Sequence, residues 1–99
     1  MLRPARSAPF EDEAVNSSAI PRGKPAPICG ALAEVIREQR EARKLSMYEL
    51  AKRAGISREM VRLVEARRTN PTFDLAARIC AVFGVTLTRL VAEAERRCV

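Results

Sequence analysis

The stretch from Leu45 to Asn70 constrains the fold more than any other part of the chain, because two helix starts lie close together on either side of a glycine. Ser46 is followed three residues later by Glu49, the capping-box spacing that satisfies free backbone N–H groups at the start of a helix. A helix is therefore predicted from Met47 to the residue before Gly55, since glycine readily adopts the positive φ that ends a helix.

A second short helix is predicted directly after this turn, with Ser57 as its N-cap. Val61 and Val64 are expected to face the core. The outward face is polar and basic, and it carries Arg58, Glu59, Arg62 and Leu63. The two predicted helices are joined by a turn of very few residues.

Apolar residues at helical spacing predict three further helices and no strand. The first is expected from about Ala31 to Arg43, the fourth from its cap at Thr72 to Gly84, and the fifth after a cap at Thr86. The expected inward residues of these three helices are Leu32, Val35, Ile36, Phe73, Ala76, Ile79, Cys80, Phe83, Leu87, Leu90 and Val91. The predicted fold class is all-α, a compact domain of five short helices.

Residues 1–30 contain five of the six prolines, so they are predicted to form a flexible Pro-rich arm outside the folded domain of residues 31–97. The simplest interpretation is a plain tail. Alternatively, Arg3, Arg6, Arg22 and Lys24 contact phosphates, Pro9-Phe10 docks on a protein partner, or the start codon is misassigned.

The 18 Lys and Arg residues against 12 Asp and Glu give a net charge of +6, which favours an anionic partner such as nucleic acid or a membrane surface. The chain has no histidine, which excludes histidine-based zinc sites and proton shuttles. No apolar run approaches the roughly 18 residues of a membrane span, and the first residues lack the apolar segment expected of a signal peptide. Cys29, Cys80 and Cys98 are odd in number and far apart, as expected for reduced thiols in the cytoplasm. No metal or cofactor is expected.

From roughly Leu32 to Ala94 the chain resembles the Cro/repressor-type (XRE-like) helix-turn-helix family of DNA-binding domains. The motifs that carry the resemblance are Leu45-Ser46, Leu50-Ala51, Gly55-Ile56-Ser57, Glu65, Asn70-Pro71 and Phe83-Gly84-Val85. The resemblance implies a repressor-like fold whose second motif helix enters the major groove of double-stranded DNA. It also implies a sequence-specific transcriptional regulator that binds a pseudo-palindromic operator as a homodimer.

The resemblance implies that bases are contacted by Arg58, Glu59, Arg62 and Leu63. Arg58 suits the O6 and N7 atoms of guanine, Glu59 suits cytosine N4, and Leu63 suits a thymine methyl group. Arg62 contacts either a base or a phosphate. The plain alternative is a solvated helix face, on which Glu59 stabilises the helix dipole.

Phosphate contacts are implied for Ser46, Met47, Arg68, Thr69 and Asn70, with the backbone amides at the helix start as donors. The chain departs from the family at Met47, where a glutamine is common. Because methionine cannot donate a hydrogen bond, only the backbone amide remains available there.

An inward salt bridge between Arg40 of the first helix and Glu65 is also implied by the resemblance. If the pair is buried, removing one partner costs about 3 to 5 kcal/mol. If the pair is exposed, it is worth less than about 1 kcal/mol.

Leu87, Leu90, Val91 and Val99 are either a dimer surface or part of the monomer core. Two further functions stay open besides regulation. The first is an antitoxin that binds DNA while its arm or C-terminal end binds a toxin. The second is a protein-interaction module, suggested by Met47 and Glu59. Enzyme activity is not expected, because no nucleophile is paired with a base.

Overall fold

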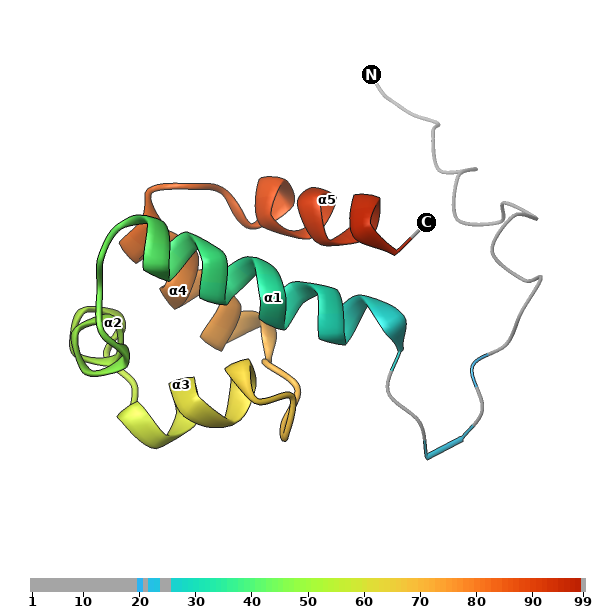
Figure 1. The fold of residues 1–99 in the computed structure, drawn as a ribbon, viewed down its shortest axis with the longest axis horizontal. Coiled ribbons are helices and arrows are strands. Elements are labelled where there is room, and N and C mark those ends of the chain that lie inside the picture. The colour runs from blue at the N-terminus through green and yellow to red at the C-terminus, as the bar shows by residue number, and fades with distance from the viewer. Residues whose placement is uncertain (1–19, 21, 24–25, 99) are drawn as a thin grey trace, which may run out of the picture.

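The computed structural model describes residues 20, 22–23 and 26–98, which form five helices and no strand (Figure 1). The helices are α1 (Pro27–Ala42), α2 (Met47–Ala54), α3 (Arg58–Glu65), α4 (Phe73–Phe83) and α5 (Leu87–Arg97). The prediction of an all-α chain with five helices in this order is confirmed for the described residues.

The long helix α1 lies in the middle of the domain, with α5 packed along one side and α4 behind it (Figure 1). Helices α2 and α3 pack against each other on the other side of the molecule, where α2 also contacts α4. The most deeply buried large side chains are Val35, Ile36, Leu50, Val61, Val64 and Ile79. They come from four helices, so one apolar core holds α1, α2, α3 and α4 together.

The predicted helix starts are confirmed by their caps. The Ser46 hydroxyl accepts a hydrogen bond from the Glu49 amide at 3.0 Å, and the Glu49 carboxylate accepts one from the Ser46 amide at 2.9 Å. Hydroxyl caps also start the next three helices, at Ser57, Thr72 and Thr86. Helix α4 ends at Gly84, with φ of 76°.

Helix α1 begins at Pro27, four residues before the predicted start at Ala31. The prediction took proline as a helix breaker, but proline fits the first helical position because the N–H it lacks has no intrahelical partner there. Ile28 also packs against the core, which gives this extra turn an apolar anchor. The remaining predictions for the arm, at Arg3, Arg6, Pro9, Phe10 and Lys24, lie outside the described residues.

Phe73 was predicted to face the core, and this prediction was wrong, because 82% of the residue's surface is exposed. It is the first residue of α4, two turns or about 10 Å along the axis from the buried Cys80. Helical periodicity gives the direction of a side chain, but not whether a neighbouring helix lies opposite it. Leu32, Leu87 and Val91 are only half-buried, whereas Leu90 is 3% exposed and belongs to the core.

None of the described helices is by itself long and apolar enough to cross a membrane. Helices α4 and α5 pass that test only as a joined pair, and they are bent by 102° at their junction.

After two of the described helices, a residue other than glycine takes the left-handed conformation. Lys44 follows α1 with φ of 56°, and the amides of Lys44 and Leu45 donate to the carbonyls of Glu41 and Arg40. Arg67 follows α3 with φ of 62°. Residues other than glycine are disfavoured in this conformation by about 1 to 2 kcal/mol.

Replacing Lys44 by glycine should raise the free energy of unfolding by about 0.5 to 1 kcal/mol, because glycine adopts the φ of this position without strain. The control is Lys52→Gly on the exposed side of α2, where glycine should lower the free energy of unfolding by about 1 kcal/mol. Urea unfolding of both variants measures the two effects. If both variants lose stability, the turn at Lys44 is not strained.

Candidate nucleic-acid interface

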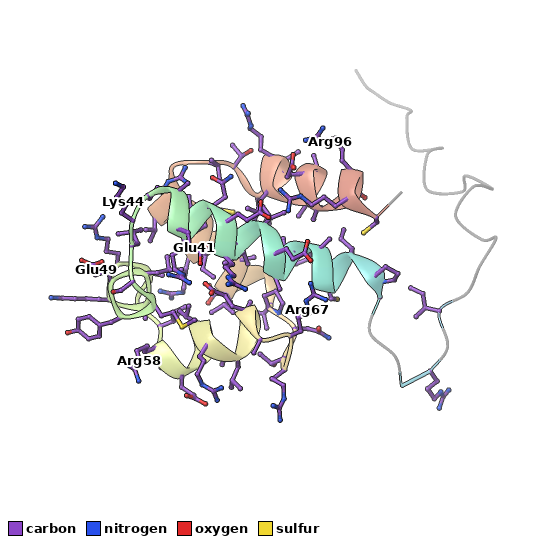
Figure 2. All side chains as sticks on the ribbon, in the orientation of Figure 1. Glu41, Lys44, Glu49, Arg58, Arg67 and Arg96 are labelled. Carbon is purple, nitrogen blue, oxygen red and sulfur yellow. The ribbon has the colours of Figure 1, made fainter. Side chains whose placement is uncertain are left out.

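Helix α3 presents a polar, basic face to solvent. Its inward residues Val61 and Val64 are both 1% exposed, whereas Arg58, Glu59 and Arg62 are exposed. In Figure 2, Arg58 extends from the first turn of α3 away from the other helices. Leu63 is half-buried at the edge of this face. No other described segment covers the outward face of α3.

The turn between α2 and α3 depends on Gly55, which has φ of 75°. A Cβ at this position would also lie 3.1 Å from the guanidinium Nη1 of Arg78. That guanidinium donates at 3.4 Å to the carbonyl of Ala54, the last residue of α2. Glycine is therefore needed for its backbone conformation, and the space it leaves is used by an arginine from α4.

A buried ion pair joins α3 to α1. Arg40 donates from Nε and Nη2 to the two carboxylate oxygens of Glu65, at 2.7 and 2.9 Å. The two side chains are 10% and 3% exposed, and Arg40 Nη1 also donates to the carbonyl of Leu45 at 2.8 Å. The hydrogen bonds with Glu65 raise the pKa of Arg40, against the opposing effect of burial. One side chain of α1 thus holds both the end of α3 and the turn before α2.

Glu59 and Arg62 are paired with each other on the outward face of α3. Arg62 Nε donates to Glu59 Oε1 at 3.0 Å, and a second hydrogen bond joins Arg62 Nη2 to Glu59 Oε2. Hydrogen bonding from Arg62 holds the pKa of Glu59 below its usual value. The two side chains are therefore not independent, since a ligand that engages one of them also affects the other.

The start of α2 offers two backbone donors. The capping box uses the amides of Ser46 and Glu49, which leaves those of Met47 and Tyr48 without acceptors inside the helix. The Met47 side chain packs against the core and has no hydrogen-bond donor, so only the backbone amide of this residue can donate to a ligand. The Ser46 hydroxyl hydrogen is free to donate, because the oxygen acts only as an acceptor in the cap.

The remaining predicted phosphate contacts lie in the loop after α3. Arg68 and Asn70 are exposed, and Thr69 is half-buried. The loop begins at the left-handed residue Arg67, whose guanidinium is held by Glu34 of α1 at 2.6 Å. This exposed ion pair joins the start of the loop to α1.

Several arginines have structural partners that the sequence did not predict. Arg43 Nη2 donates to the carbonyl of Phe83 at the end of α4, at 2.9 Å, and its guanidinium lies 4.9 Å from the centre of the Phe83 ring. Arg97 of α5 is bound by Glu38 of α1 at 2.7 Å, which lowers the pKa of Glu38. The partners are 40 and 59 residues apart in the chain, so sequence spacing gave no signal.

A model of the helix-turn-helix family matches residues 36–90, more than half of the chain. The match falls within the Leu32 to Ala94 segment and confirms the resemblance to the Cro/repressor-type family. No curated protein matches the chain by sequence.

Three solved structures confirm the repressor-like fold. The clp gene regulator ClgR from Corynebacterium glutamicum has a TM-score of 0.68 and 23% identity, over 75% of this chain and 78% of that chain. A mutant of the restriction-modification controller protein C.Esp1396I has a TM-score of 0.67 and 15% identity, over 73% and 94%. The hypothetical transcription factor NHTF from Neisseria has a TM-score of 0.65 and 27% identity, over 80% and 93%.

Removal of Glu65 should be strongly destabilising, because Arg40 would remain buried without its partner. We expect Glu65→Leu to lower the free energy of unfolding by about 3 to 5 kcal/mol. Arg37→Ala is the control, since it breaks an exposed pair with Glu41 and should cost less than about 1 kcal/mol.

The double variant Arg40→Met/Glu65→Leu should recover most of the loss, since no charge is left buried. Thermal and urea unfolding of the single and double variants measure the coupling free energy between Arg40 and Glu65. Equal losses in the free energy of unfolding for Glu65→Leu and Arg37→Ala would show that the buried Arg40–Glu65 pair stabilises the fold no more than an exposed pair does.

Proposed function

The chain belongs to the helix-turn-helix family, and from this premise we propose that it is a transcriptional regulator that binds a specific DNA sequence through α3. The observation that carries the proposal is the exposed basic face at the start of α3, on a helix anchored by the buried Arg40–Glu65 pair. A rigid, exposed helix of this kind can enter the major groove, which is wide enough to admit it. The three similar structures are those of a clp gene regulator, a restriction-modification controller protein and a hypothetical transcription factor, which supports this class of function.

In the proposed complex Arg58 is the main base reader. Its guanidinium extends into solvent at the start of α3 and suits the O6 and N7 atoms of a guanine. Glu59 and Arg62 meet the DNA as one paired unit, in which the carboxylate accepts from cytosine N4 and Arg62 contacts a base or phosphate. Leu63, at the edge of the face, provides apolar contact with a thymine methyl group.

Two phosphate groups are bound by each copy of the chain in this proposal. The first is held at the start of α2, by the amides of Met47 and Tyr48 and the hydroxyl of Ser46. The second is held by Arg68, Thr69 and Asn70 in the loop after α3. Backbone amides at the first site take over the role of the missing glutamine side chain.

One α3 helix spans only a few base pairs, so we propose that two copies bind together. Two reading helices about 34 Å apart then occupy successive major grooves of a pseudo-palindromic operator. The protein acts by occupying DNA without a catalytic step, and we place it in the cytoplasm. The antitoxin and interaction-module hypotheses stay predictions, because neither the described residues nor the similar structures test a protein partner at the arm or at the C-terminal end.

Arg58→Ala should relax the preference for one base pair in each half-site by about 1 to 3 kcal/mol, while binding to random DNA stays nearly unchanged. The control is Arg89→Ala on α5, which removes the same charge far from α3. Selection of bound sites from a random DNA pool, followed by affinity measurements on single-base variants, gives the comparison. Equal losses on selected and random DNA would contradict the role of Arg58 as a base reader.

Affinity for the selected operator should fall steeply with salt concentration. Arg68 neutralises one phosphate in each of two copies, and Arg62 neutralises a second if it contacts a phosphate instead of a base. The slope in a plot of log K against log salt is therefore predicted to be about −2 with Arg62 on a base and about −4 with Arg62 on a phosphate. Fluorescence anisotropy between 50 mM and 300 mM salt, about the range over which such slopes are measured, gives the value. A flat dependence would indicate a partner other than nucleic acid.

A further inference from the structure

The outward face of α4 differs from those of the other helices because it is largely apolar. Its exposed residues are Phe73, Asp74, Ala77, Arg78 and Ala81, which we call the α4 outer face. Phe73, Ala77 and Ala81 follow one another at intervals of four residues, so they form a single row along the helix. The charged residues Asp74 and Arg78 form the adjacent row and are paired at 2.9 Å.

Phe73 and the two alanines form a projection beside a shallow surface. Phe73 is 82% exposed, the highest exposure among the large apolar residues of the described chain. Ala77 and Ala81 have only methyl side chains, and small residues let a second helix approach to about 8 Å. One helix face therefore provides both an aromatic group to be covered and a site at which an aromatic group can pack.

We propose that the α4 outer face is the surface on which a second copy of this chain docks, with the two α4 helices antiparallel across a two-fold axis. Phe73 of each copy then packs on Ala77 and Ala81 of the other. Reversing the direction of one helix also brings Asp74 of each copy opposite Arg78 of the other. Asp74 can accept this additional contact, because its side chain is 78% exposed.

The face favours a second copy over an unrelated protein because it is complementary to itself. A two-fold interface uses the same patch on both partners. Each group in the patch must therefore meet a complementary group that belongs to the same patch of the other copy. The α4 outer face has an aromatic group with small residues one and two turns away, and an acid with a base one turn away. The predicted surface on α5 is a weaker alternative, because Leu90 is buried within one copy and Leu87 and Val91 are half-buried, so none of the three is as exposed as Phe73. Val99, the fourth residue of that prediction, lies outside the described residues.

The position of α4 also suits the proposed function, on which this inference rests. Helix α4 starts at Phe73, directly after the loop that carries Arg68, Thr69 and Asn70. In the proposed antiparallel contact the two predicted phosphate-binding loops lie at opposite ends of the α4 pair, about one helix length apart.

The contact is too small to hold two copies together in dilute solution. An eleven-residue helix is about 16 Å long and covers much less than the roughly 800 Å² that each partner buries in a standard interface. Dimers should therefore form on DNA, where adjacent half-sites raise the effective concentration of the second copy. Binding to two half-sites is then cooperative, while the free chain is largely monomeric.

The test measures binding of the full chain to DNA with one half-site and with two half-sites of the selected operator. We expect the wild type to bind the second half-site about tenfold more tightly than the first. Phe73→Gln and Ala77→Gln should remove this cooperativity and leave single-site affinity within about twofold. Ala92→Gln, an equally neutral change at an exposed alanine of α5, should leave cooperativity intact. Thermal unfolding confirms that each variant is folded.

A second measurement needs no DNA. In sedimentation equilibrium at high protein concentration, the wild type should self-associate weakly, and Phe73→Gln should abolish this association. Independent binding of two wild-type copies, or unchanged cooperativity in Phe73→Gln and Ala77→Gln, would overturn the proposal. Loss of cooperativity in Ala92→Gln alone would indicate that the two copies contact each other through α5 instead of α4. Absence of any DNA binding would overturn the proposed function instead, and the sedimentation result would still decide the α4 contact.

Discussion

The arrangement of the two motif helices depends on the buried pair between Arg40 and Glu65. Helix α3 has only eight residues, and a helix of two turns is not stable alone in water. Its inward valines fix which face is buried, but two small apolar side chains allow it to rotate and slide. The bidentate pair with Arg40 removes that freedom at one end, while the Gly55 turn fixes the other. The Arg40 guanidinium also donates to the carbonyl of Leu45, so the same group helps to position the start of α2.

The positive charge of the chain serves two different purposes. Arg40, Arg43 and Arg78 donate to backbone carbonyls at or just after the ends of helices, which have no partners inside the helix. Arg67 and Arg97 connect α1 to the loop after α3 and to α5. The net charge therefore indicates an anionic partner by its sign, but it overstates how many basic groups face that partner.

Local signals in the sequence predicted the helix starts and the motif well. Serine and threonine caps and Gly55 and Gly84 act within a few residues, so Met47 was identified as a helix start from its neighbours alone. The same reasoning failed at Pro27, where proline begins a helix, and it gave no signal at Lys44 and Arg67, which adopt the left-handed conformation without glycine. The exposure of Phe73 depends on which helices lie nearby in space, which periodicity does not contain. Within the candidate interface, the outward residues of α3 followed from spacing, whereas the Glu59–Arg62 pairing was missed although i,i+3 contacts are common in helices.

If α3 binds DNA as proposed, the pairing of Glu59 with Arg62 also limits how the DNA preference of the chain can change over time. A substitution at either position alters two side chains at once, because the remaining partner is released to adopt a new rotamer and to seek a new hydrogen bond. A new target sequence is then reached most readily by a pair of substitutions, and the intermediate with only one of them recognises neither the old nor the new sequence well. Arg58 has no such ion-pair partner among the described residues, so in the proposed complex a drift in target preference would start at the base pair assigned to Arg58.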